Sequence, residues 1–249
     1  AFMILQKSLP HNPLEAVKLP GIKPLDLADW LKPDDAFAGQ MSQRAQLLTQ
    51  SREAVLKMTP TAVVAAQELL ELVLAHRYNG ARHHVTRPDG VEVAIDWQDP
   101  LATLGLICQE DFCLLERPEG SVEHVLTGAV LCFPASWTLR EKFMRPLIGI
   151  HHTVDSYDAG LAARVQRLFD GVQVGRPLWR FNALWYQSPE LFSPRAESDP
   201  RDHSHGEDAP YMRSEQQVIL RLPRTRAVVF SIHTYMLHRD DVMRQWGDA

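Results

Sequence analysis

The chain has 249 residues, 45% hydrophobic and 23% charged, the composition of a soluble globular protein with one domain or two closely fused ones. A net charge of −5 argues against nucleic acid or an anionic membrane as a partner, and no stretch approaches the roughly 20 apolar residues that span a bilayer. Three cysteines outside any C-x-x-C pattern argue against a cysteine-built zinc or iron–sulfur site and favour the reducing cytoplasm.

The first third of the chain has the pattern of helices. Residues 34–58 are rich in Gln, Arg, Ala and Leu, and the helix breaker Pro60 follows them. Residues 61–77 repeat apolar side chains at the spacing of one helical stripe, with no internal Gly or Pro. A turn at 88–90 then leads into a short strand over residues 91–95, where apolar and polar side chains alternate.

Strands are expected to dominate the middle of the chain. Residues 103–117 predict two short strands around a polar segment at 109–111, whose carboxylates we interpret as a solvated turn rather than a catalytic pair. The nearly continuous apolar run at 123–133 predicts a strand that is buried on both faces. Residues 157–172 have the pattern of an amphipathic helix.

The last third shows the clearest alternation. Residues 177–186 predict a strand with aromatic side chains on one face and Arg180 and Asn182 on the other. Residues 217–223 and 226–237 have strong β propensity. Helices followed mainly by strands predict an α+β fold, with a helical N-terminal region and then an antiparallel sheet.

A pair of adjacent histidines is the first candidate for chemistry. His151 and His152 follow an apolar stretch, and along a strand they would point in opposite directions. They fit a ligand of a metal or of haem iron, a general base, or hydrogen-bonded structural residues, and the pattern leaves these alternatives open. An apolar lining with one inward histidine is what haem iron needs.

A second pair, His203 and His205, lies among acidic residues at 193–210, a stretch with the composition of a mobile surface loop. Alternate residues of a flexible polar loop make a weak metal site, so we expect no physiological metal there. The chain also lacks the glycine-rich patterns of nucleotide-binding loops.

Several segments together carry a resemblance to a known family. They read PLDLADWL, QELLELVLAH, QED, CFPASWTLREK, PLIGIHHTVDSY, RFN followed by LFSP, SEQQVILRLP and AVVFSIHTY. Their order and spacing resemble the haem-dependent oxidative N-demethylase family, which is similar to the haem-binding alpha subunit of dimethylamine mono-oxygenase. The resemblance implies one domain over residues 1–249, with a mainly helical lead over 1–80 and a PAS-like α+β haem-binding core over 85–240.

The resemblance implies a set of residues that hold the cofactor. It makes His151 the candidate ligand of the iron, while His152 occupies a variable place. Lys142, Arg180, Asn182 and Arg221 match the family pattern and are implied to bind the cofactor. The two arginines have the geometry to pair with haem propionates.

The resemblance also implies catalytic residues. Glu215, Tyr157 and Tyr235 are the candidates that position an amine or relay a proton, with Glu215 the first choice because a dialkylamine is cationic at neutral pH. Two positions depart from the family: Gln216 and His233 each replace an arginine, which removes two candidate partners for propionates or for a substrate carboxylate.

The function implied by the resemblance is that of a mono-oxygenase with one non-covalent haem b, since the chain has no C-x-x-C-H attachment site. It would use O₂ to demethylate a small methylated amine and release formaldehyde. Electrons would come from a separate flavin and iron–sulfur reductase that uses NADPH, and the oligomeric state stays open. The alternatives are a non-catalytic PAS-like haem or small-ligand sensor, and an interaction subunit that has lost haem.

Overall fold

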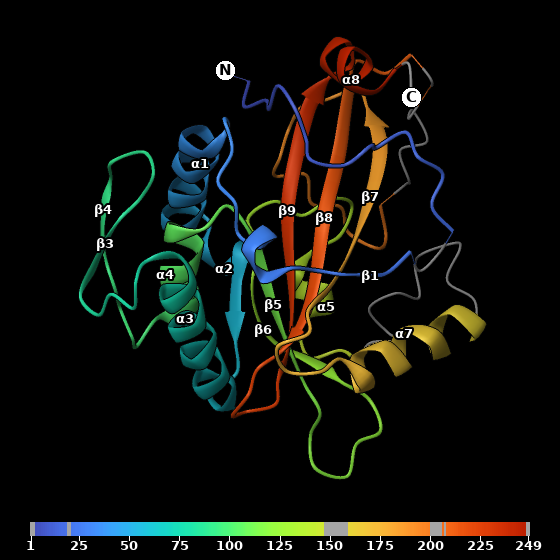
Figure 1. Cartoon of the computed structure of the whole chain (residues 1–249). Helices are drawn as coiled ribbons and strands as arrows, with labels where there is room; N and C mark the ends of the chain where they lie inside the picture. Colours follow the sequence, from blue (N-terminus) through green and yellow to red (C-terminus); the bar gives the residue numbers. More distant parts are fainter. Residues whose placement is uncertain (1–2, 19–20, 147–158, 200–205, 207, 248–249) are drawn as a thin grey trace.

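Within the described residues, a seven-stranded antiparallel sheet forms the centre of the molecule, with helices on both faces (Figure 1). The computed structural model describes residues 3–18, 21–146, 159–199, 206 and 208–247. Across the sheet the strands follow the order β1-β7-β8-β9-β5-β6-β2. Their bounds are Lys23–Pro24 (β1), Leu56–Met58 (β2), Asp111–Glu116 (β5), Val125–Val130 (β6), Leu178–Tyr186 (β7), Tyr211–Arg221 (β8) and Val228–His238 (β9).

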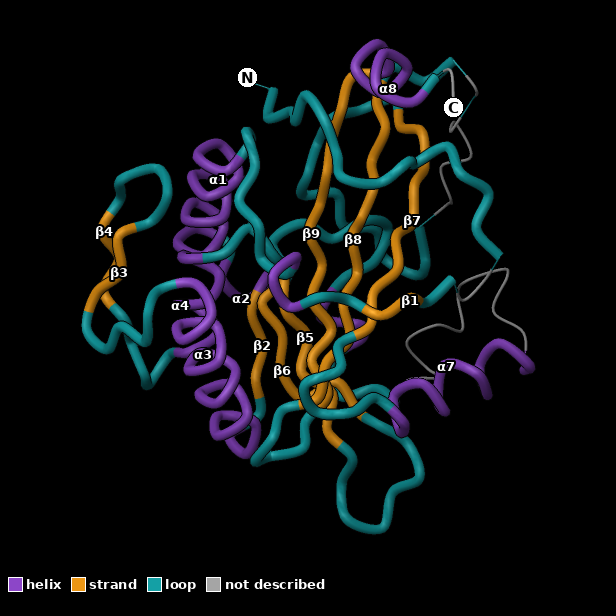
Figure 2. Tube along the Cα trace, in the orientation of Figure 1, coloured by secondary structure: helices purple, strands orange, loops and turns teal. Residues whose placement is uncertain are grey.

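The longest pair of strands, β8 and β9, runs through the middle of the sheet (Figure 2). Their register extends from Tyr211 opposite His238 to Arg221 opposite Val228. The two strands predicted from β propensity are confirmed, although β8 begins six residues earlier than its apolar pattern indicated. The register fixes which side chains share a face, because successive residues of a strand point to opposite sides.

One face of the sheet, which we call the α3 face, packs against α1 (Phe37–Gln50), α3 (Val63–Arg77) and α4 (Pro100–Ile107) (Figure 1). The apolar stripe of α3 lies in the same buried cluster as Val218 and Leu220 of β8. The helix predicted over 61–77 is therefore confirmed, and burial of its stripe against the sheet stabilises it more than its intrinsic propensity does.

The opposite face, which we call the α7 face, packs against α7 (Ala159–Gly171) and α5 (Leu139–Lys142). Phe169 of α7 lies in the same buried cluster as Ile219 of β8. The odd-numbered side chains of β8 therefore point to the α7 face, and the even-numbered ones to the α3 face. The predicted amphipathic helix is confirmed.

Two expectations about the N-terminal half are wrong. Residues 100–107 form the helix α4 rather than a strand, so the segment predicted as two strands contributes only β5. A short apolar run has no periodicity that separates a buried strand from a buried helix, and Pro100 stands in the first helical turn, where proline is tolerated. Residues 56–58, expected to be helical, form β2 at the edge of the sheet, paired with β6.

The remaining elements are short and lie around this framework. A small two-stranded sheet carries the predicted turn, with Gly90 at φ 81°. The bounds are Leu27–Asp29 (η1), Arg52–Val55 (α2), Pro60–Ala62 (η2), His84–Thr86 (β3), Glu92–Ala94 (β4) and Arg239–Trp246 (α8). In the part of the chain that the structure describes, no helix is both long and apolar enough to cross a membrane.

Candidate functional site

A carboxylate at the middle of β8 is the centre of a polar cluster on the α7 face. Glu215 lies opposite Asn182 of β7. Asn182 donates its Nδ2 to Glu215 Oε2 at 3.2 Å, and its Oδ1 accepts from the Glu215 main-chain N–H at 3.1 Å. Gln217, the next residue on this face, donates its Nε2 to the same Oε2 at 3.1 Å. Two neutral amides thus hold the carboxylate, which is almost buried.

The two guanidinium groups near Glu215 are engaged elsewhere. Arg180 donates from Nη1 to Gln217 Oε1 at 2.6 Å. Arg213 donates to the main-chain oxygens of Phe133 and Leu191, and its Nη2 stays 3.5 Å from Glu215 Oε1. Burial lowers the pKa of Arg180, although the charge of Glu215 opposes this. Glu215 therefore has a long ion pair with Arg213, whose shorter hydrogen bonds go to main-chain oxygens.

Two buried polar atoms beside Glu215 have no hydrogen-bond partner. They are Nε of Arg213, two residues away on the same face of β8, and Oγ1 of Thr234, the residue opposite Glu215 on β9. Buried polar atoms are almost always satisfied, so unpaired ones mark a place where a ligand or water completes the bonding. Sequence reasoning missed both residues, although alternation along β8 places Arg213 with Glu215 once β8 is extended.

Arg221 and Lys142 do not join this cluster through the contacts described. Arg221, at the far end of β8, donates to the main-chain oxygens of Phe169 and Val172 at the C-terminal end of α7. A cation there is favoured by the helix dipole. Lys142 of α5 forms an ion pair with Glu197 at 2.8 Å.

Tyr235 lies on the other side of the sheet from Glu215. It is opposite Ser214 in the β8–β9 register, and it is buried on the α3 face. Burial raises the pKa of the Tyr235 hydroxyl, and the charges of Asp34 and Glu110 raise it further. The sheet thus separates the two catalytic candidates that the structure describes.

The other predicted site residues lie outside the described part of the chain. These are the pair at 151–152 with its implied iron ligand His151, the catalytic candidate Tyr157, and the loop histidines His203 and His205. Of the loop predicted to be mobile, residues 193–199, 206 and 208–210 are described, and Glu197 there contacts α5 through Lys142.

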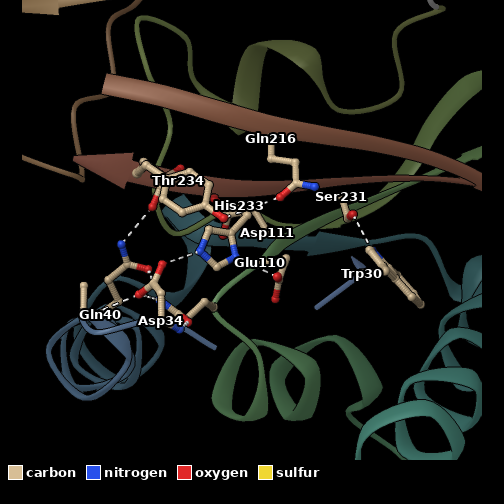
Figure 3. Close-up of polar contacts among 12 residues, drawn as sticks. Trp30, Asp34, Gln40, Glu110, Asp111, Gln216, Ser231, His233 and Thr234 are labelled. Carbon is tan, nitrogen blue, oxygen red and sulfur yellow. Dashed lines mark hydrogen bonds and ion pairs between the residues drawn. The ribbon is translucent and has the colours of Figure 1, made fainter. Parts of the chain in front are cut away.

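A second polar cluster, on the α3 face, corrects the interpretation of residues 109–111. They are buried, not solvated: Glu110 and Asp111 are 4% and 1% exposed. The His233 imidazole bridges two carboxylates, with Nδ1 2.7 Å from Glu110 Oε1 and Nε2 2.8 Å from Asp34 Oδ2 (Figure 3). Burial alone would lower the pKa of His233, but these two carboxylates outweigh it and raise the pKa to about 9. The bridge is therefore an imidazolium.

The neighbouring carboxylate, Asp111, is also fully compensated. Its Oδ1 lies 2.8 Å from Nη1 of Arg44, and both side chains are almost completely buried. Arg44 donates further to the main-chain oxygens of Gly105, Gln109 and Glu110, so it ties α1 to α4 and to the start of β5. Asp111 in turn accepts from the main-chain N–H groups of residues 132 and 133.

The two departures from the family pattern fall on this α3 face. Gln216 and His233 lie opposite each other on β8 and β9. The charge that an arginine would supply at position 233 is supplied by the imidazolium. Neither replacement touches the contacts of Glu215, so the cluster on the α7 face is unaffected by them.

Thiols and metal clusters are poor candidates among the described residues. No group of three or more His, Cys, Asp or Glu side chains there could hold a metal ion. The three cysteines are buried, and burial raises the pKa of each thiol, which disfavours a thiolate ligand.

The donors on the α7 face fit a ligand that carries carboxylates, as haem does. Arg180 and Arg213 are cationic donors, and Arg213 Nε has no partner. Two small cavities on the other side of the sheet, one lined by Tyr78 and one by Trp30, measure about 10 Å³ each, room for about one water. The fit to haem therefore rests on the donor chemistry of the α7 face.

The fold and this cluster define a class: an α+β protein that presents a buried carboxylate and unpaired polar atoms on one face of an antiparallel sheet. Comparison with protein families identifies it further. The family described as haem-dependent oxidative N-demethylase, alpha subunit-like, matches residues 21–247. The chain belongs to this family, as its sequence motifs predicted.

Proposed function

We propose that this protein is a haem-dependent mono-oxygenase that removes a methyl group oxidatively from a small methylated amine and releases formaldehyde. Membership of the family supports dependence on haem and N-demethylase-like chemistry. Across the sheet, five strands follow the order β6-β5-β9-β8-β7, and along the chain α5 and α7 lie between β6 and β7. This arrangement supports a PAS-like core.

The proposal rests on the contacts of the Glu215 carboxylate. A small dialkylamine is a cation at neutral pH, and a carboxylate held by neutral amides, with its nearest guanidinium nitrogen 3.5 Å away, attracts such a cation. Thr234 Oγ1, buried and unpaired next to it, is a second acceptor for an ammonium N–H. Glu215 binds and orients the amine, and it takes up the ammonium proton when nitrogen must be neutral.

Haem, when bound, supplies the reduction of O₂ and the oxidation of the methyl carbon; overall, O₂, two electrons and two protons yield formaldehyde, the demethylated amine and water. Arg180 and Asn182 would hold it from the α7 face, Arg180 through a propionate. His151 stays the proposed ligand of iron and Tyr157 a proposed proton relay. Heme b is expected, because the chain has no covalent attachment motif.

Electrons would come from a separate partner. The sequence has no flavin or nicotinamide fingerprint and no cysteine set for an iron–sulfur cluster, so we propose a flavin and iron–sulfur reductase that uses NADPH. Three unpaired cysteines support a cytoplasmic location.

The test uses the full chain expressed with haem supply. Absorption spectra before and after dithionite and CO measure haem, and formaldehyde is assayed with dimethylamine and either a reductase or hydrogen peroxide. Glu215→Gln should keep the haem and lose most product, and His151→Ala should lose haem where His152→Ala does not. Firm haem binding with no formaldehyde under any regime would instead support the sensor, and a colourless protein would exclude both.

A further inference from the structure

The side-chain amide of Gln217 lies between a guanidinium and a carboxylate. Its Oε1 accepts from Arg180 Nη1 at 2.6 Å, and its Nε2 donates to Glu215 Oε2 at 3.1 Å. The two ends of the amide therefore match the charge that each one faces. Only an amide does this: a carboxylate at position 217 would repel Glu215, and an apolar side chain would bond to neither neighbour.

The strand register shows what Gln217 prevents. Arg180 is opposite Gln217, and Asn182 is opposite Glu215, so Arg180 and Glu215 are diagonal neighbours on the same face. Diagonal neighbours are about 7–8 Å apart at Cα, which long side chains can bridge. In a partly buried place, a guanidinium free to reach a carboxylate would form a charge-assisted pair with it. Such a pair would add a second cation to Arg213, whose Nη2 already lies 3.5 Å from Glu215 Oε1, and would cancel the charge of Glu215.

We propose that Gln217 is a positioning residue that holds Arg180 away from Glu215 and so reserves the carboxylate for a cationic alkylammonium ligand. The ligand class rests on the proposed function. Selectivity for a cation over an uncharged molecule of the same shape follows from this arrangement.

The first experiment measures binding, not turnover. The full chain is titrated calorimetrically with diethylammonium and with diethyl ether, which has nearly the same shape and no charge. Gln217→Leu should weaken diethylammonium binding about tenfold, the scale of a hydrogen bond to a charged group, and leave binding of the ether unchanged. Gln216→Leu is the matched control, because the neighbouring glutamine points to the α3 face, and it should leave both affinities as they are.

The second experiment tests the mechanism through Arg180. If Gln217 acts by keeping Arg180 away, its replacement should matter only while Arg180 is present. Gln217→Leu should thus cost less than about twofold in affinity when it is added to Arg180→Met, against about tenfold in the native background. An equal loss in both backgrounds would show that Gln217 only packs or bonds to Glu215, and would overturn the proposal.

These outcomes separate the inference from the proposed function. Native protein that binds diethylammonium no better than the ether overturns the inference whatever its activity. The expected pattern without any formaldehyde supports the inference and removes the demethylase proposal. Where turnover is measured, Gln217→Leu should raise KM for the amine much more than it lowers kcat, because the amide does not touch the reacting carbon.

Discussion

Two regions of the molecule treat buried carboxylates differently. Around α1 and the start of β5, Asp34, Glu110 and Asp111 each have a cationic partner at 2.7 to 2.8 Å. On the α7 face, Glu215 has neutral amide donors, and its nearest guanidinium nitrogen stands at 3.5 Å. Asp34 precedes α1, Glu110 and Asp111 lie at the start of β5, and Glu215 lies in β8. All four are packed on one sheet, so the difference lies in the partners that each region supplies.

This difference separates two uses of a buried charge. A carboxylate with a full set of partners joins segments that are distant along the chain, and removing one partner leaves an uncompensated charge. A carboxylate that is short of cations contributes less to folding and keeps its charge for a ligand. Stability and binding should therefore respond in opposite ways to substitutions in the two regions.

The largest effect should come from breaking the buried ion pair of Arg44. Arg44→Met removes the cation beside Asp111 together with three hydrogen bonds to main-chain oxygens. Loss of one partner of a buried ion pair costs about 3–5 kcal/mol, so the free energy of unfolding should fall by that amount in urea titrations.

Glu215→Gln on the α7 face is the matched substitution for this comparison. It removes a buried charge whose cationic partner among the described contacts, Arg213, stands 3.5 Å away, and the new amide oxygen can still accept from Asn182 and Gln217. The unfolding free energy should change by less than about 1 kcal/mol. A loss as large as that of Arg44→Met would mean that Glu215 is a structural carboxylate like Asp111.

The next effect is a dependence of stability on pH through His233. Its pKa is raised to about 9 in the folded protein, above the ordinary value of 6.5. The folded state thus holds the proton more tightly, and the stabilisation is fully present below pH 6.5 and lost as the pH rises through 9. The full loss is about 3 kcal/mol, measurable by urea unfolding at about pH 6 and about pH 9.5.

His233→Arg restores the residue of the family pattern and removes the titration. Its stability should change much less over the same interval, because a guanidinium stays charged. His11 acts in the opposite direction: burial, and then the charge of His233, lower its pKa to about 4, so it destabilises the folded state slightly at pH 6. It does so in both proteins, and the difference between them therefore isolates His233. Equal pH dependence in the native protein and in His233→Arg would exclude His233 as the source.

The sequence predicts features that are local along the chain better than contacts between distant segments. Alternation along β7 placed Arg180 and Asn182 on one face correctly, because a period of two is local to the strand. The cofactor role of Arg221 rested on the resemblance alone, and nothing in the pattern indicated that its donors reach the end of α7. The family match identified Glu215, but its partners became evident only from the strand register.

The burial of residues 109–111 could not be predicted for the same reason. Three polar residues between apolar stretches normally form a solvated turn. Here the compensating charges come from Arg44, 66 positions before Glu110, and from His233, 123 positions after it. A local pattern carries no signal of partners so distant, and the helix α4 next to this segment was misassigned because its apolar run is short.

The smallest effect should appear at Thr234, and it distinguishes an unpaired hydroxyl from a paired one. Thr234 Oγ1 is buried without a partner, whereas Thr103, equally buried, donates from Oγ1 to the Asp96 and Asp99 main-chain oxygens and accepts from the Asp96 N–H. Valine has nearly the same shape as threonine. Thr103→Val should therefore destabilise by about 1–2 kcal/mol, since it leaves a main-chain N–H unpaired, while Thr234→Val should be neutral or stabilise by up to about 1 kcal/mol. Urea unfolding of the two variants measures the difference.

The same Thr234→Val protein should bind diethylammonium a few-fold more weakly, because one acceptor beside Glu215 is gone. Destabilisation comparable to that of Thr103→Val, with unchanged amine binding, would show that the Thr234 hydroxyl belongs to the folded structure and not to the ligand site.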